Sequence, residues 1–590
     1  MRSNYHVGKQ RSKKVFVVFV TVVTLATIPF GVGKYIEFNR PSPGDSCAYV
    51  YSSQHILDGA KIGVDERPSA QVGTLLLNML GVGLFGFNEF GPKLIQTILQ
   101  IFALVMMFFA MRQLFGNSAA LVGVVVASVY LSAPLVVERG NEKEQYMTSF
   151  MMLGVSCFVL GQLGGRWWWY VLSGAFAAWG PLFKETGISA IVAIGLFVIV
   201  QPLMKHRTWG QTGRDILLLF VGAGLALTPI YIWLVKVNAP KSYWPYSFAW
   251  NILIASEGPK LGSYVAYSRE ICPLAKQLPE VLRYYRKLRL PILLAVAAII
   301  TRLIRLNSSR LGRLKEERKT TYDRFVLLFG VWWVLDMVFV WISPRSYGHY
   351  YLPLNASAAM LSGYVIALYC DKAVRDKNKV RWRRIGLVGV ICILALSWSV
   401  FKNYALKLQE TIDIRRNNLK DSWEVVGEYI RTNSTEKDKI YVWGWLPGIY
   451  VKAQRFSPTP CACIANMHIF RPETLSAMIT EMLKALEEDK PKFIVDTRKI
   501  HFPGDRPPLE LWPKTPRGFI LMEQKQIQAY DAAHSELLAG KFGQDEALRY
   551  KVMAPFRELV MKNYKIVPGS FGEHILFELK ASLKSDQAQL

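Results

Sequence analysis

Eleven long apolar stretches, separated by short polar loops, constrain the fold of this chain more than any other feature of its sequence. A helix that crosses a bilayer needs about 20 mostly apolar residues. The sequence therefore predicts a polytopic α-helical membrane protein with about eleven transmembrane helices, the first of which is retained rather than cleaved as a signal peptide. The stretches cover residues 15–33, 92–114, 118–137, 148–163, 167–183, 187–204, 215–236, 289–305, 325–342, 350–369 and 385–402.

The distribution of charge predicts how these helices are oriented. Only 19% of the 590 residues are charged, yet the formal net charge is +27. Four short segments, 1–14, 202–214, 302–324 and 371–384, carry net charges of +5, +3, +5 and +5, which sum to +18. Because basic residues gather in cytoplasmic loops, we expect these segments and the N-terminus to be cytoplasmic. The charge therefore indicates topology rather than binding to nucleic acid.

The chain after about residue 403 has a different pattern. With a cytoplasmic N-terminus and an odd number of spans, this part is expected outside the cytoplasm. Helices alternating with short strands predict a small α/β layer. We therefore expect two domains, a transmembrane module over 1–402 with an external loop at 34–91, and an extracytoplasmic α/β domain over 403–590. The expected helices are 421–431 and 472–489, and the expected strands are 439–444, 492–497, 565–569 and 574–579.

Ionisable residues gather in four clusters, all at the predicted outer ends of spans. Charges close to the hydrocarbon region are costly, so each is a candidate functional residue. Ordinary alternatives stay open: solvated loop charges, a wetted turn, a salt-bridged hairpin, aromatic anchoring, and an N-cap role for Asp45. The candidates are Asp45, Glu66 and Arg67 in the first loop, Glu144 in 138–144, Lys184 in 184–186, and Arg345 and His349 in 343–351.

The residue types in these clusters fit one kind of chemistry. Carboxylates can activate a hydroxyl or amine nucleophile or hold a cation. Arginine, lysine and histidine can stabilise an anionic leaving group such as a lipid-linked phosphate. A transporter more often places its polar residues near the bilayer midplane on broken helices. Polar residues at one face of the bundle therefore favour an enzyme.

The first loop also resembles a known family. Residues 44–91 resemble the first external loop of the GT-C glycosyltransferases, closest to the branch of lipid A aminoarabinose transferases and protein O-mannosyltransferase-like enzymes. Asp45 matches the aspartate that opens that loop, and 66–68 (Glu-Arg-Pro) matches an acidic-Lys-Pro motif with arginine in place of lysine. Ser46 stands where many members have a second acid, which weakens a two-carboxylate mechanism.

The resemblance continues along most of the chain. Glu144 falls at the acid of the family's second loop, and Lys184 falls at the lysine that follows helix five. Residues 345–354 resemble the Arg/His-Tyr entry into a late helix, and 441–460 resemble the external domain of bacterial members. The order of these matches, rather than any single one, identifies the chain as similar to this family.

The resemblance implies a GT-C fold and an inverting transfer of a sugar from a polyprenyl-phosphate-linked donor at the outer face of the cell (inner) membrane. Asp45 would be the general base or would orient the acceptor, and Glu66 and Glu144 would position the acceptor or a metal. Metal dependence varies in the superfamily, so a divalent cation is the one cofactor left open. The residues that would bind the donor phosphate are Arg67, Lys184, Arg345 and His349.

Two other functions remain open at this point. The first is a flippase or transporter of lipid-linked sugars, which would not need a base such as Asp45. The second is a non-catalytic envelope scaffold or receptor that works through residues 403–590. The sequence specifies neither the sugar nor the acceptor, which could be a lipid, a protein or a polysaccharide.

Overall fold

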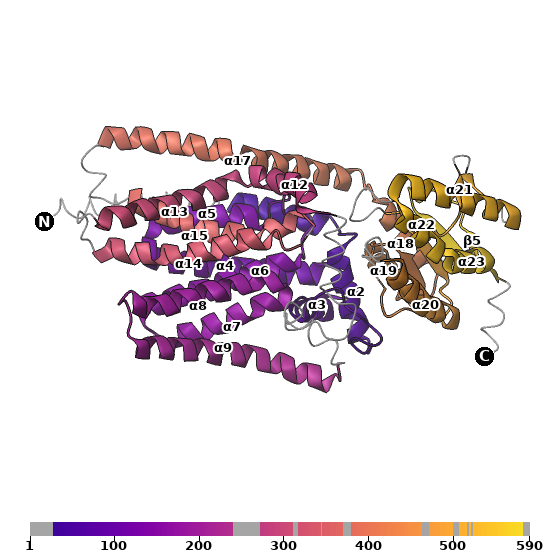
Figure 1. The fold of residues 1–590 in the computed structure, drawn as a ribbon, viewed down its shortest axis with the longest axis horizontal. Coiled ribbons are helices and arrows are strands. Elements are labelled where there is room, and N and C mark those ends of the chain that lie inside the picture. The colour runs from indigo at the N-terminus through magenta and orange to yellow at the C-terminus, as the bar shows by residue number, and fades with distance from the viewer. Residues whose placement is uncertain are drawn as a thin grey trace.

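The protein is a long helical bundle followed by a smaller α/β part, as Figure 1 shows for a computed structural model. Five helical segments are long and apolar enough, by length and composition, to cross a membrane: Phe90–Phe115, Lys143–Gly164, Glu185–Leu203, Trp209–Lys236 and Gly348–Leu368. The prediction of a mostly helical membrane protein is therefore confirmed. The structure describes residues 27–137, 139–239, 272–310, 317–343, 345–369, 379–462, 471–499, 507–515, 518–520 and 523–581.

Every predicted apolar stretch after the first coincides with a helix of the bundle. For the first stretch, residues 27–39 are helical, and residues 15–26 lie outside the described ranges, as do 1–14 and 371–378. The bundle helices are α4 (Phe90–Phe115), α5 (Asn117–Leu131), α6 (Lys143–Gly164), α7 (Trp167–Phe183), α8 (Ile188–Leu203), α9 (Trp209–Lys236), α12 (Leu274–Lys287), α13 (Arg289–Arg310), α14 (Glu317–Phe339), α15 (Pro353–Tyr369) and α17 (Lys379–Arg416).

Helix α17 is longer than its apolar stretch predicted. It continues through 403–416, where the sequence is amphipathic and contains neither glycine nor proline. The helix ends just before Asn418, whose φ of 48° lies in the left-handed region that asparagine tolerates. This extension carries the chain from the bundle to the α/β part (Figure 1).

Glycines allow two of the bundle helices to touch through their backbones. A Cβ atom on Gly174 of α7 would lie 1.9 Å from the Leu219 carbonyl oxygen of α9. A Cβ atom on Gly222 of α9 would lie 1.9 Å from the Val171 carbonyl oxygen of α7. Small residues at such crossings are the usual means of close helix packing in membranes, because apolar side chains gain little from leaving lipid.

The α/β part contains a four-stranded sheet in the order β1-β2-β6-β5. Strands β1 (Ile440–Trp443) and β2 (Phe493–Asp496) are parallel, whereas β6 (Ile575–Leu579) is antiparallel to both β2 and β5 (Tyr564–Ile566). The predicted strands are thus present. A separate hairpin joins β3 (Lys514–Thr515) and β4 (Gly518–Phe519). The helices of this part are α18 (Ser422–Thr432), α19 (Gly448–Ala453), α20 (Pro472–Glu488), α21 (Gln524–Phe542), α22 (Gln544–Val552) and α23 (Ala554–Asn563).

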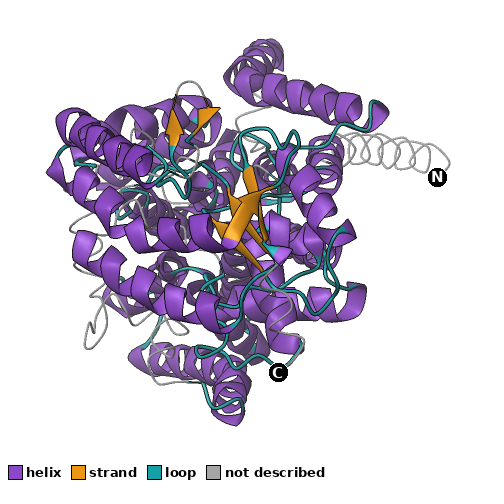
Figure 2. Cartoon of the chain, turned by 90° about the vertical axis from the view of Figure 1, so that its right-hand side faces the viewer, coloured by secondary structure: helices purple, strands orange, loops and turns teal. Residues whose placement is uncertain are grey.

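Both faces of the sheet are covered, and one of them packs on the first loop. Strands β1 and β2 are buried along their whole length, as expected for parallel strands covered on both sides. Residues of α20 and α23 fill one face. On the other face, Cys47, Val50 and Tyr51 of α2 (Asp45–Leu57) join residues of α18 and α19 in one apolar core. Figures 1 and 2 show the sheet across the end of the bundle where α2 and α3 (Val72–Phe85) lie.

The α7–α9 contact gives a testable prediction with a matched control. Changing Gly222→Ala should force the two backbones apart and lower the free energy of unfolding by roughly 1–3 kcal/mol. Changing Gly224→Ala, two residues further along α9, should be neutral or slightly stabilising, because nothing lies within 4 Å of a Cβ there. Thermal unfolding of the full chain in detergent measures both effects, and equal midpoints for the two variants would contradict the contact.

Candidate functional site

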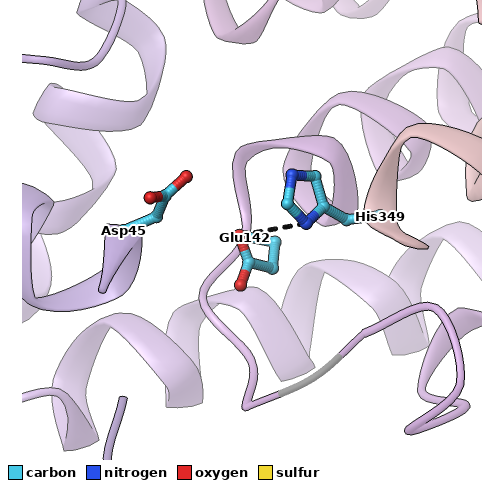
Figure 3. Close-up of side chains that lie close together, drawn as sticks. All are labelled: Asp45, Glu142 and His349. Atoms are coloured by element: carbon cyan, nitrogen blue, oxygen red, sulfur yellow. Dashed lines mark ion pairs between the residues drawn. The ribbon is translucent and has the colours of Figure 1, made fainter. Parts of the chain in front are cut away.

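Three ionisable side chains from distant parts of the chain meet at the end of the bundle beneath the α/β part. Asp45 begins α2, Glu142 is the N-cap of α6, and His349 lies in the short helix η3 (Gly348–Tyr351). One ligand atom of each lies within 4.8 Å of the others. Figure 3 shows the His349 ring beside Glu142, with its Nδ1 4.0 Å from Glu142 Oε2.

A buried ion pair extends this group. The Lys184 Nζ atom donates to Glu144 Oε1 at 2.8 Å and lies 3.3 Å from the centre of the Tyr350 ring. Glu144 Oε1 is also 4.0 Å from the Nε2 atom of His349. The imidazole therefore lies between two carboxylates, and the five residues form one charged cluster: Asp45, Glu142, Glu144, Lys184 and His349.

Asp45 is oriented by two donors rather than used as a helix cap. The N-cap of α2 is Gly44, and no side chain caps this helix, so the capping alternative is wrong. The indole Nε1 of Trp445 donates to Asp45 Oδ1 at 2.9 Å, and the Tyr49 hydroxyl donates to Oδ2 at 3.4 Å. Burial raises the pKa of Tyr49 well above its usual value, and the negative charge of Asp45 raises it further. The phenol therefore stays a proton donor.

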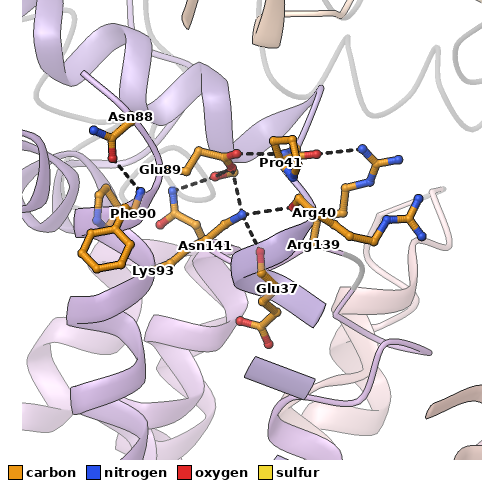
Figure 4. Close-up of polar contacts among 12 residues, drawn as sticks. Glu37, Arg40, Pro41, Asn88, Glu89, Phe90, Lys93, Arg139 and Asn141 are labelled. Carbon is orange, nitrogen blue, oxygen red and sulfur yellow. Dashed lines mark hydrogen bonds and ion pairs between the residues drawn. The ribbon is translucent and has the colours of Figure 1, made fainter. Parts of the chain in front are cut away.

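A buried hydrogen-bond network behind Asp45 fixes α2 against the bundle. Figure 4 shows Glu89, Lys93 and Asn141 of this network. The Ser46 hydroxyl donates to Glu89, whose carboxylate is also paired with Lys93 at 3.4 Å. Asn141 Nδ2 donates to Ser46 Oγ at 3.0 Å, and the φ of Asn141 is 59°. Because Glu142 follows Asn141 directly, this strained but well-bonded turn positions Glu142 against Asp45.

The structure does not bring every predicted site residue to the cluster. Asp45, Glu144, Lys184 and His349 belong to it, and Arg345 is half-buried on the segment that leads into η3. Glu66 is buried elsewhere, where Ser52 Oγ donates to it at 2.6 Å and His55 Nδ1 lies 3.0 Å away. Ser52 is seven residues from Asp45 along α2, roughly 10 Å.

Arg67 also lies apart from the cluster. Its guanidinium forms two hydrogen bonds with the Glu481 carboxylate of α20, at 2.8 and 3.3 Å. Its backbone N–H donates to the Pro460 carbonyl oxygen at 2.9 Å. Arg67 therefore joins the first loop to the α/β part.

Sequence reasoning did not single out three members of the site: Glu142, Tyr350 and Trp445. In the structure Glu142 and Gln145 form a capping box at the start of α6, but a glutamate at the N-cap is not part of the usual sequence signature. For Tyr350, the sequence pattern indicates only aromatic anchoring at the membrane interface. Trp445 carries no local signal, since its partner Asp45 is 400 residues earlier in the chain.

Asp45, Glu142 and His349 form a set of groups that fits a divalent cation. Two carboxylates and one imidazole are common ligands of Zn²⁺ and related metal ions. One ligand atom of each of the three groups lies within 4.8 Å of the others, and the side chains of Glu142 and His349 are largely shielded from solvent. These residues would hold a cation if the protein uses one.

The Lys184–Glu144 pair gives a prediction about stability. Both side chains are largely buried, so Lys184→Gln should leave an unpaired buried carboxylate and cost about 3–5 kcal/mol of unfolding free energy. The double variant Lys184→Gln/Glu144→Gln removes that charge and should recover most of the loss. Unfolding of the single and double variants in detergent measures the coupling. If the double variant loses stability at least as much as the single variant does, the two residues do not act as a unit.

A match to a known protein family covers the part of the bundle that carries several residues of the cluster. Residues 72–233, which include Glu142, Glu144 and Lys184, match the family described as dolichyl-phosphate-mannose-protein mannosyltransferase. No curated protein sequence matches the chain.

Solved structures share the fold over nearly the whole chain. ArnT from Cupriavidus metallidurans, bound to undecaprenyl phosphate, is 16% identical, with a TM-score of 0.54 over 95% of this chain and 98% of that chain. The same protein in the apo state gives 15% identity and a TM-score of 0.52 over 96% and 99%. The oligosaccharyltransferase AglB from Archaeoglobus fulgidus, in complex with an inhibitory peptide and a dolichol-phosphate, is 12% identical, with a TM-score of 0.54 over 96% and 81%. The match over residues 72–233 and the fold shared over nearly the whole chain together support a resemblance to the GT-C superfamily of membrane glycosyltransferases.

Proposed function

We propose that this protein transfers a sugar from a polyprenyl-phosphate-linked donor to an acceptor at the outer face of the membrane, with inversion in a single displacement. The observation that carries the proposal is the cluster of three carboxylates, one lysine and one histidine at one end of the bundle, next to the α/β part. The similar ArnT and AglB structures hold an undecaprenyl phosphate and a dolichol-phosphate, so this fold accommodates lipid phosphates.

The cationic residues suit the phosphate that leaves with the lipid. Glu144 and the Tyr350 ring hold the Lys184 ammonium in place, so it needs little reorganisation to meet a phosphate oxygen. His349 and the half-buried Arg345 lie on the same short segment and add further donors. In this proposal neither Arg67 nor Glu66 contacts the donor. Arg67 has a structural role through its contact with Glu481, and Glu66 has one through its contacts with Ser52 and His55.

The carboxylates suit the acceptor. Asp45 is partly exposed, and its two oxygens are oriented by Trp445 and Tyr49, so it can take a proton from an acceptor hydroxyl or amine as general base. Glu142 and Glu144 would position the acceptor. A divalent cation bound by Asp45, Glu142 and His349 would supply Lewis-acid stabilisation of the phosphate or the acceptor oxygen.

Replacing Asp45 tests the proposed base. Asp45→Asn keeps the shape of the side chain but cannot take a proton, so the rate should fall on the order of 10²- to 10⁴-fold. The assay follows release of polyprenyl phosphate from a synthetic polyprenyl-phosphate-linked sugar, with envelope membranes as the source of acceptor. Asp65→Asn is the matched control, because Asp65 is an exposed aspartate of the same loop. A near wild-type rate for Asp45→Asn would remove Asp45 from the mechanism.

The same assay separates a base from a cation ligand. If Asp45 acts as base, excess Mn²⁺ leaves the Asp45→Asn rate unchanged. If Asp45 acts by holding a cation, the wild-type enzyme loses its activity with EDTA, and excess Mn²⁺ restores part of the Asp45→Asn rate. Movement of the intact donor across vesicles without release of phosphate would instead favour a flippase.

The proposed orientation places the N-terminus in the cytoplasm and residues after 403 outside it. The basic 202–214 segment joins α8 to α9 at the end of the bundle opposite the α/β part, which supports this orientation (Figure 1). An engineered Lys541→Cys, exposed near the end of α21, should react with an impermeant thiol reagent in intact cells. Lys205→Cys should react only after permeabilisation. The wild-type chain is the control for labelling of the native cysteines. The reverse pattern would contradict the orientation.

A further inference from the structure

A second site lies at the end of the bundle opposite the Asp45 cluster. A pocket of about 580 Å³ opens between the C-terminal halves of α8 and α13 and the middle of α14. Its walls are mostly aliphatic, including Val200, Leu303 and Val331. This volume falls within the range of small-molecule sites. None of the residues that line it belongs to the proposed transfer site.

One end of the pocket is basic. Arg302 and Arg324 both line it, and Arg305 lies one helical turn beyond Arg302. Asp323 is the carboxylate at this end, and it already contacts Arg305 at 3.2 Å and Arg302 at 3.7 Å. Among the described residues, no carboxylate pairs with Arg324, and its buried Nε has no hydrogen-bond partner. Asp323 is thus shared by Arg302 and Arg305, while Arg324 has no carboxylate in the part of the chain that the structure describes, which leaves a surplus of positive charge.

The other end of the pocket is lined by apolar residues of α14. Along α14 the lining runs from Asp323 to Leu335, a rise of roughly 18 Å at 1.5 Å per residue. This is a little more than half of the ~30 Å hydrocarbon core. Gly330 lies in the middle of this wall, where an added Cβ would meet only the Ile299 side chain, at 3.8 Å. The shape therefore suits one extended hydrocarbon chain with a charged head.

We propose that this pocket binds an anionic glycerophospholipid of the cytoplasmic leaflet, with one acyl chain beside Gly330 and the phosphate at Arg302 and Arg324. Basic pockets between helices on the cytoplasmic side are suited to anionic head groups. A zwitterionic lipid would leave the surplus charge uncompensated. A donor lipid is disfavoured, because its phosphate must reach the Asp45 cluster at the opposite end of the bundle. The choice against a donor lipid rests on the proposed function, whereas the basic pocket itself does not.

The test compares two lipids that differ only in the head group. The full-length protein in detergent is titrated with phosphatidylglycerol or with phosphatidylcholine of the same acyl chains, and bound lipid is counted by native mass spectrometry. Phosphatidylglycerol should bind more tightly to the wild-type chain. Arg324→Gln should weaken its binding roughly 5-fold, the effect of about one basic residue. Arg214→Gln, an exposed arginine outside the pocket, should have no effect.

A second pair of variants tests the acyl chain. Gly330→Phe should place a phenyl ring in the space proposed for the acyl chain and abolish the preference for phosphatidylglycerol. Gly224→Phe, on the open face of α9, should not change this preference. Equal binding of the two lipids to the wild-type chain would overturn the proposal. So would a preference that survives both Arg324→Gln and Gly330→Phe, or displacement of phosphatidylglycerol by an equimolar polyprenyl phosphate.

Discussion

The buried network around Ser46 and Glu89 is the constraint on which the proposed active site depends. Burying ions without partners is costly, and here each acid has a cation or several donors. Lys93 pairs with Glu89 and also donates to the Glu37 carbonyl oxygen, while Lys34 pairs with the Glu37 carboxylate at 2.7 Å. These contacts hold the end of the first helix, the start of α2 and the start of α4 in one geometry.

The α/β part contributes to the site as well as covering it. Helix α2 shares its apolar core with the sheet, so Asp45 is carried on an element that belongs to both halves of the protein. Trp445, which follows β1, donates to Asp45, and Lys499, which follows β2, donates to the Trp445 carbonyl oxygen at 3.2 Å. The carboxyl ends of the two parallel strands therefore face the bundle. In the proposed reaction, an acceptor would meet residues of both parts at once.

The bundle uses its two ends differently. Buried ions with precise partners gather at the end beside the α/β part, where we place the chemistry. At the other end, arginines outnumber acids around an apolar pocket, where we place a structural lipid. Between them, close helix contacts such as Gly174 with Leu219 make the bundle a rigid spacer. The two proposed sites thus lie at opposite ends of the bundle.

The sequence by itself determined where most helices and strands lie, because the length of an apolar stretch and the charges near its ends are local properties. It located the described bundle helices that follow the first apolar stretch and the strands of the α/β part, and it named Asp45, Glu144, Lys184 and His349 as candidates. It missed the extension of α17, because an amphipathic helix beyond the membrane has no apolar run. Only the tertiary structure paired Trp445 with Asp45 and Arg67 with Glu481, since these partners lie 400 and 414 residues apart. Which charge meets which depends on how the helices pack, and no local pattern encodes that.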